Sequence, residues 1–276
     1  MLGRLVRASA RKGWIVLLQD KVAVVYGAGG SVGGAVSHAF AREGARVFLA
    51  GRTPVTLEQV AADISAAGGR AETAAVDALD EEAVDRFVDD VVGQTGRIDA
   101  SFNTVGHGDV HGATLLDMPF EDFMRPIATA MRAQFLTTRA AARHMVRQGE
   151  GVIMAITATT ARQVLPEVGG TGVAFDAIES QCRQWATELG RRGVRVAWLQ
   201  TTGIPDGLHA EVFPAYGTGK PMDRRELIAW QEAKTMLGRL TTLADVGNAA
   251  AWLASDQAAL MTGAGLNVTA GAAPGR

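Results

Sequence analysis

The fold of this chain is decided by the stretch VAVVYGAGG, residues 22–30, in which an apolar run of strand length ends in a cluster of glycines. A helical period of apolar residues begins at Val32 and continues to Phe40. A strand, a glycine turn and a helix in this order are typical of a nucleotide-binding unit, because glycines let a pyrophosphate approach the N–H groups at the helix start. A glycine-rich turn with no ligand is the alternative interpretation.

The rest of the chain continues the alternation of apolar runs and helical periods. Further strands are expected over 46–50, 71–76, 98–103, 152–156, 194–199 and 265–268, and helices over 53–67, 80–94, 120–148, 172–191 and 245–254. Most of these strands are apolar without alternation, which indicates a parallel sheet covered on both faces. We therefore predict a single α/β domain of the doubly wound, Rossmann type over residues 19–276, preceded by an N-terminal extension over 1–18.

That extension carries four basic residues before the apolar run 14–18 and superficially looks like a signal peptide. The run is shorter than the usual apolar region of such a peptide, and no small-residue cleavage site follows it. We expect a loosely packed extension or an early start codon. A short basic amphipathic segment that docks on a partner or a membrane surface is the alternative.

Composition excludes several classes of protein. The 276 residues are 47% apolar and carry a net charge of −2, which does not favour nucleic acid as a partner. No apolar run reaches the roughly 20 residues that span a bilayer. A single cysteine, Cys182, excludes an internal disulfide framework, and no cluster has metal-ligand spacing. We therefore expect a cytoplasmic protein without a bound metal, with Cys182 as a packing or subunit-contact residue.

The second predicted strand ends at Gly51-Arg52, where an acidic residue would suit a ribose 2′-OH. An arginine suits a 2′-phosphate instead, because its guanidinium makes bidentate, charge-assisted hydrogen bonds. Arg52, helped by Thr53, therefore favours NADP(H) over NAD(H). A solvated surface arginine is the alternative interpretation.

After Leu18, nearly the whole sequence resembles the short-chain dehydrogenase/reductase family. The segment 26–33 is similar to the family's TGxxxGxG loop, with Tyr in place of Thr and Ser31 in place of the middle glycine. Asp77 matches the family's adenine-contacting Asp, and the segment NTVG at 103–106 looks like its NNAG. Near the C-terminus, GRL at 238–240 and WLASD at 252–256 are also similar.

The resemblance implies a seven-stranded, mostly parallel sheet of order 3-2-1-4-5-6-7 with helices on both faces. It implies a homotetramer or homodimer packed through the helices around 120–148 and 172–191, with a substrate-covering region over 205–237. The expected cofactor-binding residues are Gly27, Gly29, Gly30, Ser31, Val32, Gly33, Arg52, Thr53, Asp77, Ala78, Asn103, Thr104, Val105, Thr202, Gly203 and Ile204.

The chain departs from the family where the family does its chemistry. The positions of the family's Asn, Ser, Tyr and Lys are, in chain order, Ala130, Ala158, Thr171 and Phe175. In the family the Tyr is the general acid/base, the Lys lowers the pKa of that Tyr, and the Ser hydrogen-bonds the reacting oxygen. The only tyrosines are Tyr26 and Tyr216, and no lysine lies between residues 22 and 219, so a shifted alignment does not restore the motif.

Other polar residues are candidates for the catalytic role. His107 follows the NTVG segment and could titrate near neutrality, while Thr157 and Thr159 flank the position of the lost Ser. A threonine hydroxyl can orient a carbonyl, but its pKa is too high for it to protonate one readily. Structural or solvent-facing roles are the alternative for each candidate. Thr160 also flanks that position, Asp176 lies beside Phe175, and His111 and His209 are more distant candidates.

Three functions follow from these observations. The first is an NADP(H)-dependent oxidoreductase that moves hydride to or from a small carbonyl or alcohol, with the proton coming from water, His107 or the substrate. The second is a non-catalytic nucleotide-binding or scaffold subunit. The third is a repurposed pocket for cyclisation, isomerisation or dehydration without net redox change. The nucleotide features favour the first, and the sequence identifies no substrate.

Overall fold

The computed structural model describes residues 16–163, 165–207 and 222–273, and the seven strands within them form one parallel sheet. Their order is β3-β2-β1-β4-β5-β6-β7, which confirms the predicted fold. The strands are β1 (Val22–Tyr26), β2 (Arg46–Gly51), β3 (Arg70–Ala75), β4 (Ala100–Asn103), β5 (Gly151–Ala158), β6 (Val194–Thr201) and β7 (Gly265–Val268).

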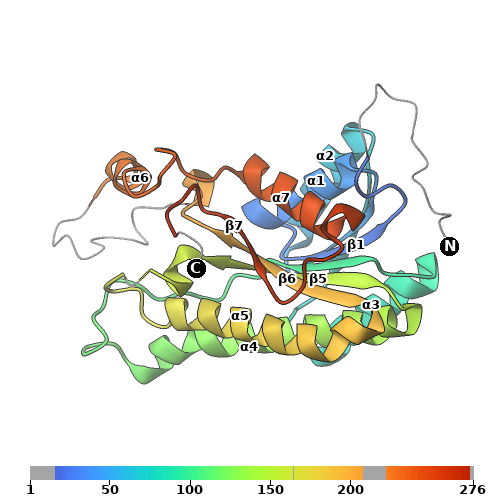
Figure 1. Ribbon diagram of the computed structural model, residues 1–276, viewed down its shortest axis with the longest axis horizontal. Coiled ribbons are helices and arrows are strands. Elements are labelled where there is room, and N and C mark those ends of the chain that lie inside the picture. The colour runs from blue at the N-terminus through green and yellow to red at the C-terminus, as the bar shows by residue number, and fades with distance from the viewer. Residues whose placement is uncertain (1–15, 164, 208–221, 274–276) are drawn as a thin grey trace.

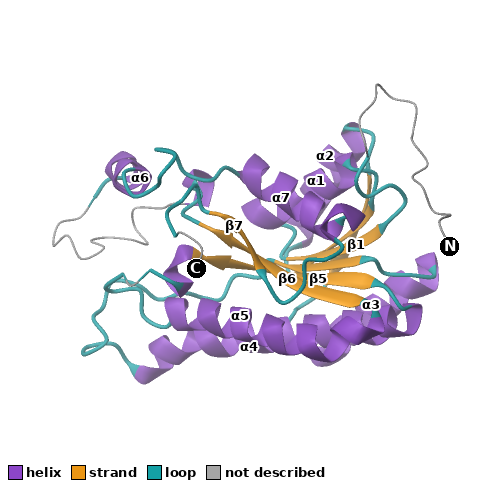
Figure 2. Cartoon of the chain, viewed as in Figure 1, coloured by secondary structure: helices purple, strands orange, loops and turns teal. Residues whose placement is uncertain are grey.

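Helices cover both faces of this sheet (Figures 1 and 2). They are α1 (Ser31–Arg42), α2 (Pro54–Ala66), α3 (Glu81–Thr95), α4 (Phe120–Gln148), α5 (Thr171–Leu189), α6 (Arg224–Glu232) and α7 (Leu243–Ala254). One face carries α1, α2 and α7, and the opposite face carries α3, α4 and α5 (Figure 1). No helix of the described residues is long and apolar enough to cross a membrane.

The central strand β1 shows why its sequence is apolar without alternation. Val22, Val24 and Tyr26 belong to the hydrophobic cluster beneath α3, α4 and α5. Ala23 and Val25, which point the other way, belong to the cluster beneath α1, α2 and α7. Successive side chains of a strand point to opposite faces, so a strand buried on both faces has no polar position.

The glycine turn after β1 is held by close backbone contacts. Gly27 has a φ of +75°, and a Cβ there would lie 2.8 Å from the carbonyl oxygen of Thr104. A Cβ on Gly33, in the first turn of α1, would lie 2.3 Å from the carbonyl oxygen of Gly27. These positions require glycine, because any side chain would push α1 away from the end of β1.

Two features differ from the sequence prediction. The substrate-covering region contains a helix, α6, that the prediction lacked. Its capping box is readable in the sequence, because the Asp223 side chain accepts from the N–H of Glu226 while the Glu226 side chain accepts from the N–H of Asp223. At the other end, Leu18, the last residue of the predicted extension, is buried in the core. Residues 1–15 lie outside the described part.

The surroundings of the Tyr26 ring predict how Tyr26→Phe changes the stability of the protein. Its edge contacts Phe87, with ring centroids 5.8 Å apart, and its hydroxyl is buried without a hydrogen-bond partner among the described residues. Tyr26→Phe keeps the ring and removes an unsatisfied polar group, so the free energy of unfolding is expected to stay constant or rise by about 1 kcal/mol.

Urea unfolding followed by tryptophan fluorescence measures this change. Phe87→Leu, which removes the ring that Tyr26 contacts, is the control and is expected to destabilise the protein. A loss of more than about 1 kcal/mol in Tyr26→Phe would show that the hydroxyl has a partner and would contradict the prediction.

Candidate functional site

A cleft of about 540 Å³ lies at the carboxyl ends of β1, β2 and β4; we call it the glycine cleft. The structure brings nine of the predicted cofactor residues together around it. These are Gly27, Gly29, Gly30, Arg52, Thr53, Asp77, Ala78, Thr104 and Val105. In an open α/β sheet, a crevice at the carboxyl ends of the strands is the usual position for a ligand.

The other predicted cofactor residues lie around this cleft or beyond it. Ser31, Val32 and Gly33 form the first turn of α1. Asn103 is buried and donates to the Thr137 hydroxyl at 2.9 Å while accepting from the N–H of Val105, so it holds the loop after β4. Three further residues do not line the glycine cleft: Thr202, Gly203 and Ile204.

The N-terminus of α1 fits an anion. Its N-cap, Gly30, has no side chain to accept from the first-turn N–H groups, and the first turn contains no acidic residue. Unpaired N–H groups and the helix dipole both favour negative charge at such a position. Arg52 lies exposed at the same cleft and makes no ion pair with any residue that the structure describes. The cleft therefore has two positive features, neither of which forms an ion pair with a carboxylate of the described residues.

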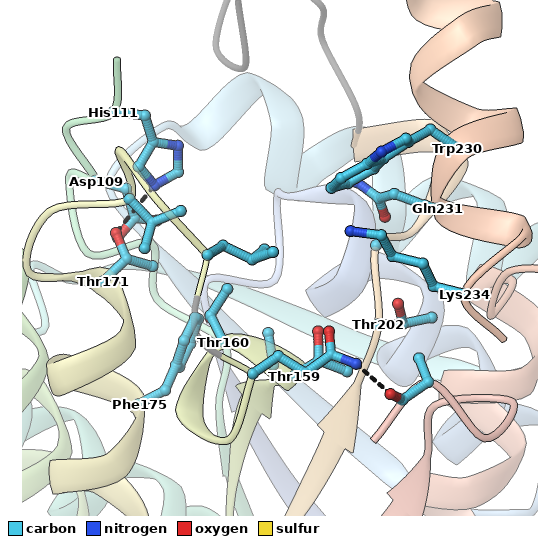
Figure 3. A pocket seen from close by; sticks show the side chains of 16 residues that line it. Asp109, His111, Thr159, Thr160, Thr171, Phe175, Thr202, Trp230, Gln231 and Lys234 are labelled. Carbon is cyan, nitrogen blue, oxygen red and sulfur yellow. Dashed lines mark hydrogen bonds between the residues drawn. The ribbon is translucent and has the colours of Figure 1, made fainter. Parts of the chain in front are cut away.

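A second cavity, of about 210 Å³, lies between the ends of β5 and β6, the start of α5, and α6 (Figure 3). We call it the threonine cavity, because four threonine side chains line it: Thr159, Thr160, Thr171 and Thr202. Three of the four positions implied for the family's catalytic residues also lie at this cavity, namely Ala158, Thr171 and Phe175. The fourth, Ala130, is buried in the core.

His107 and Phe175 form the contact between the two cavities. His107 lines the glycine cleft and Phe175 lines the threonine cavity. Their rings meet edge to face, with centroids 5.4 Å apart. Burial lowers the pKa of His107, and the Asp109 carboxylate opposes this change only in part. A neutral imidazole packed on a phenyl ring is a wall residue and a poor proton donor.

A polar cluster occupies the position implied for the family's Tyr. The Thr171 hydroxyl donates to Asp109 Oδ1 at 3.0 Å and lies 3.0 Å from His111 Nε2. Asp109 and His111 come from the loop between β4 and α4, and both line the threonine cavity (Figure 3). The sequence named His111 only as a more distant candidate, and the structure places it beside Thr171, 60 residues away in the chain.

Lys234 reaches the threonine cavity from the opposite wall. Its ammonium group points into the cavity below Trp230 and lies 3.1 Å from the centre of that ring (Figure 3). Burial lowers the pKa of Lys234. The sequence analysis missed this residue, because it follows α6 in a region without a recognised motif. Lys234 and the family's Lys position, Phe175, lie on different walls.

The remaining candidates divide between this cavity and the core. Thr159 lines the cavity, whereas Thr157 is 1% exposed and donates to Glu179 Oε1 at 3.3 Å. Glu179 is itself fully buried and accepts from Arg162 and Gln200, so this network fixes the segment after β5. Asp176 is exposed and does not line the cavity.

Four further residues were named from the sequence, and of these Tyr26 lies at the glycine cleft. Cys182 is fully buried in the core, where burial raises the pKa of its thiol to about 12, so it is a packing residue. The Tyr26 phenol is buried beneath the sheet, and burial raises its pKa far above the ordinary value. His209 and Tyr216 lie outside the described residues.

Known proteins with similar sequences and structures are oxidoreductases. Residues 27–273 match the family described as enoyl-(acyl carrier protein) reductase. The chain is 34% identical over 255 residues to the uncharacterized oxidoreductase MT0954 of Mycobacterium tuberculosis (strain CDC 1551 / Oshkosh), covering 92% of each sequence. It is 31% identical over 260 residues to the A-factor type gamma-butyrolactone 1'-reductase (1S-forming) of Streptomyces virginiae, covering 92% of this chain and 96% of that one.

Solved structures agree with these matches. An NAD+-bound xylitol dehydrogenase superposes with a TM-score of 0.85 at 26% identity, covering 92% of this chain and 99% of that one. A short-chain type dehydrogenase/reductase from Mycobacterium ulcerans gives 0.83 at 27% identity, covering 93% and 90%. The sequence match extends from the glycine turn almost to the C-terminus, and the chain therefore belongs to the short-chain dehydrogenase/reductase family.

Proposed function

We propose that this protein is an NADP(H)-dependent oxidoreductase that moves hydride to or from a small organic carbonyl or alcohol. The observation that carries the proposal is the contact between the two cavities through His107 and Phe175. A dinucleotide that begins at the glycine turn has a second cavity beside its cleft, lined by hydroxyl groups suited to a polar substrate. A nucleotide-binding scaffold would have no use for that second cavity.

The residues of the glycine cleft fit a phosphorylated dinucleotide. The uncapped start of α1 would hold the pyrophosphate, and Arg52 would pair with the 2′-phosphate. Asp77, whose Oδ1 accepts from the N–H of Leu79, is fixed where the family contacts adenine. When bound, the cofactor supplies or accepts the hydride. The protein then has to orient the carbonyl and transfer one proton, without the family's Tyr and Lys.

Arg52 provides the test of cofactor choice. Arg52→Ala is expected to weaken NADPH binding by about 10- to 100-fold, because it removes charge-assisted hydrogen bonds to the 2′-phosphate. NADH has no such phosphate, so its affinity should change by less than about threefold. Calorimetric titration of both nucleotides measures the two effects. Arg86→Ala, which removes an exposed arginine paired with Glu82 on α3, is the control.

Equal losses for the two nucleotides would mean that Arg52 does not contact the 2′-phosphate. Absence of binding by either nucleotide would reject the proposed function altogether. Tight NADPH binding combined with no oxidation of NADPH by a panel of ketones, quinones and imines would instead favour the scaffold or the non-redox enzyme.

The neutral state of His107 makes stability depend on pH. Its folded pKa is lowered by burial, so the unfolded chain binds the proton first, at about pH 6.5. The contribution of neutral His107 to the free energy of unfolding is present above that pH and is lost as the pH falls toward the folded pKa. Between pH 7.5 and 5.5, His107→Gln is therefore expected to lose less unfolding free energy than the wild type does. Denaturant unfolding at both pH values measures the loss in each protein. Equal losses in the wild type and in His107→Gln would contradict the prediction.

We also propose that the protein assembles through α4 and α5, which lie side by side on the outer face of the sheet (Figure 1). Phe120 and Phe135 on α4 and Val173 on α5 are exposed apolar residues. Phe135 contacts Trp185 of α5, with ring centroids 5.7 Å apart, so the aromatic surface crosses both helices. Apolar side chains grouped on one face are typical of a subunit interface.

Phe135→Asp tests this interface. A carboxylate placed among apolar side chains is costly to bury, so the variant is expected to shift the protein toward monomer without unfolding it. Light scattering coupled to size-exclusion chromatography measures the mass, and circular dichroism checks the fold. Val55→Asp, at an exposed apolar residue of α2, is the matched control. An unchanged mass in Phe135→Asp would place the interface elsewhere.

A further inference from the structure

We propose that Asp109, Thr171 and His111 form the proton-transfer group of the active site and replace the family's Tyr and Lys. The proposal rests on the proposed function, because it assigns the proton that accompanies hydride transfer. In it, Thr171 is the catalytic residue that contacts the reacting oxygen. His111 and Asp109 are the positioning residues that act through its hydroxyl.

The geometry supports this assignment in three ways. Thr171 is 4% exposed, begins α5 and lines the threonine cavity, so its hydroxyl is shielded from bulk solvent at the cavity wall. His111 Nε2 and Asp109 Oδ1 each lie 3.0 Å from that hydroxyl. Ala158, at the position of the family's Ser, also lines the cavity and leaves a methyl group where the family has a hydroxyl. Among the described residues of this wall, the hydroxyl of Thr171 with its two partners therefore offers a proton to the cavity.

The hydrogen bonds fix which nitrogen carries a proton. A hydroxyl has one proton to donate, and the Thr171 hydroxyl donates it to Asp109. His111 Nε2 is within hydrogen-bond distance of the same Thr171 oxygen and must therefore be the donor in that contact. The chain thus runs from the His111 N–H to the Thr171 oxygen, and from the Thr171 O–H to the Asp109 carboxylate. In the proposed relay, His111 carries a proton on both ring nitrogens before the transfer.

A relay from His111 through Thr171 compensates for the high pKa that makes an isolated threonine hydroxyl a poor acid. During reduction, the Thr171 O–H turns from Asp109 to the carbonyl oxygen, which takes its proton while the carbonyl carbon gains the hydride. As that O–H bond breaks, the proton on His111 Nε2 moves to the Thr171 oxygen, and the imidazolium becomes neutral imidazole. Water then returns one proton to the imidazole. The hydroxyl gains a proton as it loses one, so no free alkoxide forms; alcohol oxidation runs the same steps in reverse.

The other proton carriers of the described residues fit less well. The phenol of Tyr26 is buried beneath the sheet, and His107 is packed on Phe175 with a lowered pKa. Lys234 lies over Trp230 on the opposite wall, where it can contact a substrate from the far side (Figure 3). Within the part of the chain that the structure describes, a hydroxyl, an imidazole and a carboxylate meet at Thr171.

The test combines turnover with a measurement that needs no cofactor. Wild type, Thr171→Val and Thr171→Ser are assayed with NADPH and a small activated carbonyl, 4-nitrobenzaldehyde or 2,3-butanedione. Thr171→Val is expected to lower kcat about 100-fold or more with KM changed by less than about threefold, whereas Thr171→Ser keeps the hydroxyl and most of the activity. Thr187→Val, at an exposed threonine of the same helix, is the control.

His111→Ala should lose kcat to a similar degree and recover part of it on addition of imidazole, which a purely structural role would not allow. His144→Ala, at a histidine on α4 paired with Asp89, is the control. In the nucleotide-free protein, the imidazole nitrogen signals of His111 are recorded by ¹⁵N NMR. Thr171→Val is expected to shift the Nε2 signal and Thr171→Ser to preserve it, since only the serine keeps the oxygen that Nε2 contacts.

Each outcome tests a different part of the proposal. Unchanged kcat or an unchanged Nε2 signal in Thr171→Val overturns the relay, as does His111→Ala with wild-type turnover. A wild type that binds NADPH through Arg52 but oxidises none with either carbonyl also overturns the relay and leaves the cofactor assignment standing. Failure to bind NADPH rejects the proposed function itself, and the NMR comparison still reports whether His111 and Thr171 are joined.

Discussion

The close contact between Gly27 and Thr104 is the constraint on which both cavities depend. The hydroxyl and the N–H of Thr104 both donate to the carbonyl oxygen of Tyr26, at 2.7 and 3.0 Å, so the ends of β1 and β4 are joined at one atom. Gly27 then turns directly above Thr104, in a space that no side chain could share. This contact fixes α1 on one side. On the other it fixes the start of the loop that carries His107, Asp109 and His111.

A second network fixes the opposite side of the site. Glu179 is buried on α5 and joins Arg162, after β5, to Gln200 on β6. A buried carboxylate is costly unless each oxygen is paired, and here both oxygens are. The network ties α5, which begins with Thr171, to the strand that ends at Ala158. The threonine cavity therefore lies between two segments whose positions do not depend on a bound ligand.

The sequence predicted the sheet well, because β1, β5 and β6 are buried on both faces and their apolar runs have no other explanation. Nine of the residues that it named for the cofactor line the glycine cleft, since these lie within a few residues of the strand ends. The sequence did not predict the cluster of Asp109, His111 and Thr171. His111 and Thr171 are 60 residues apart in sequence, and they come together only because the loop after β4 crosses to α5. Likewise, α6 brings Lys234 to the cavity from a region with no repeating pattern.

The attachment of α6 has a consequence for how this site can change. Leu227 and Leu240 form a small hydrophobic cluster of their own, separate from the two large clusters that cover the sheet. The free energy that holds this wall is therefore largely independent of the free energy that holds the fold. A substitution in this small cluster is therefore expected to disturb α6 more than the sheet. The threonine cavity thus has one wall built from the main core and a second wall held by a small cluster of its own.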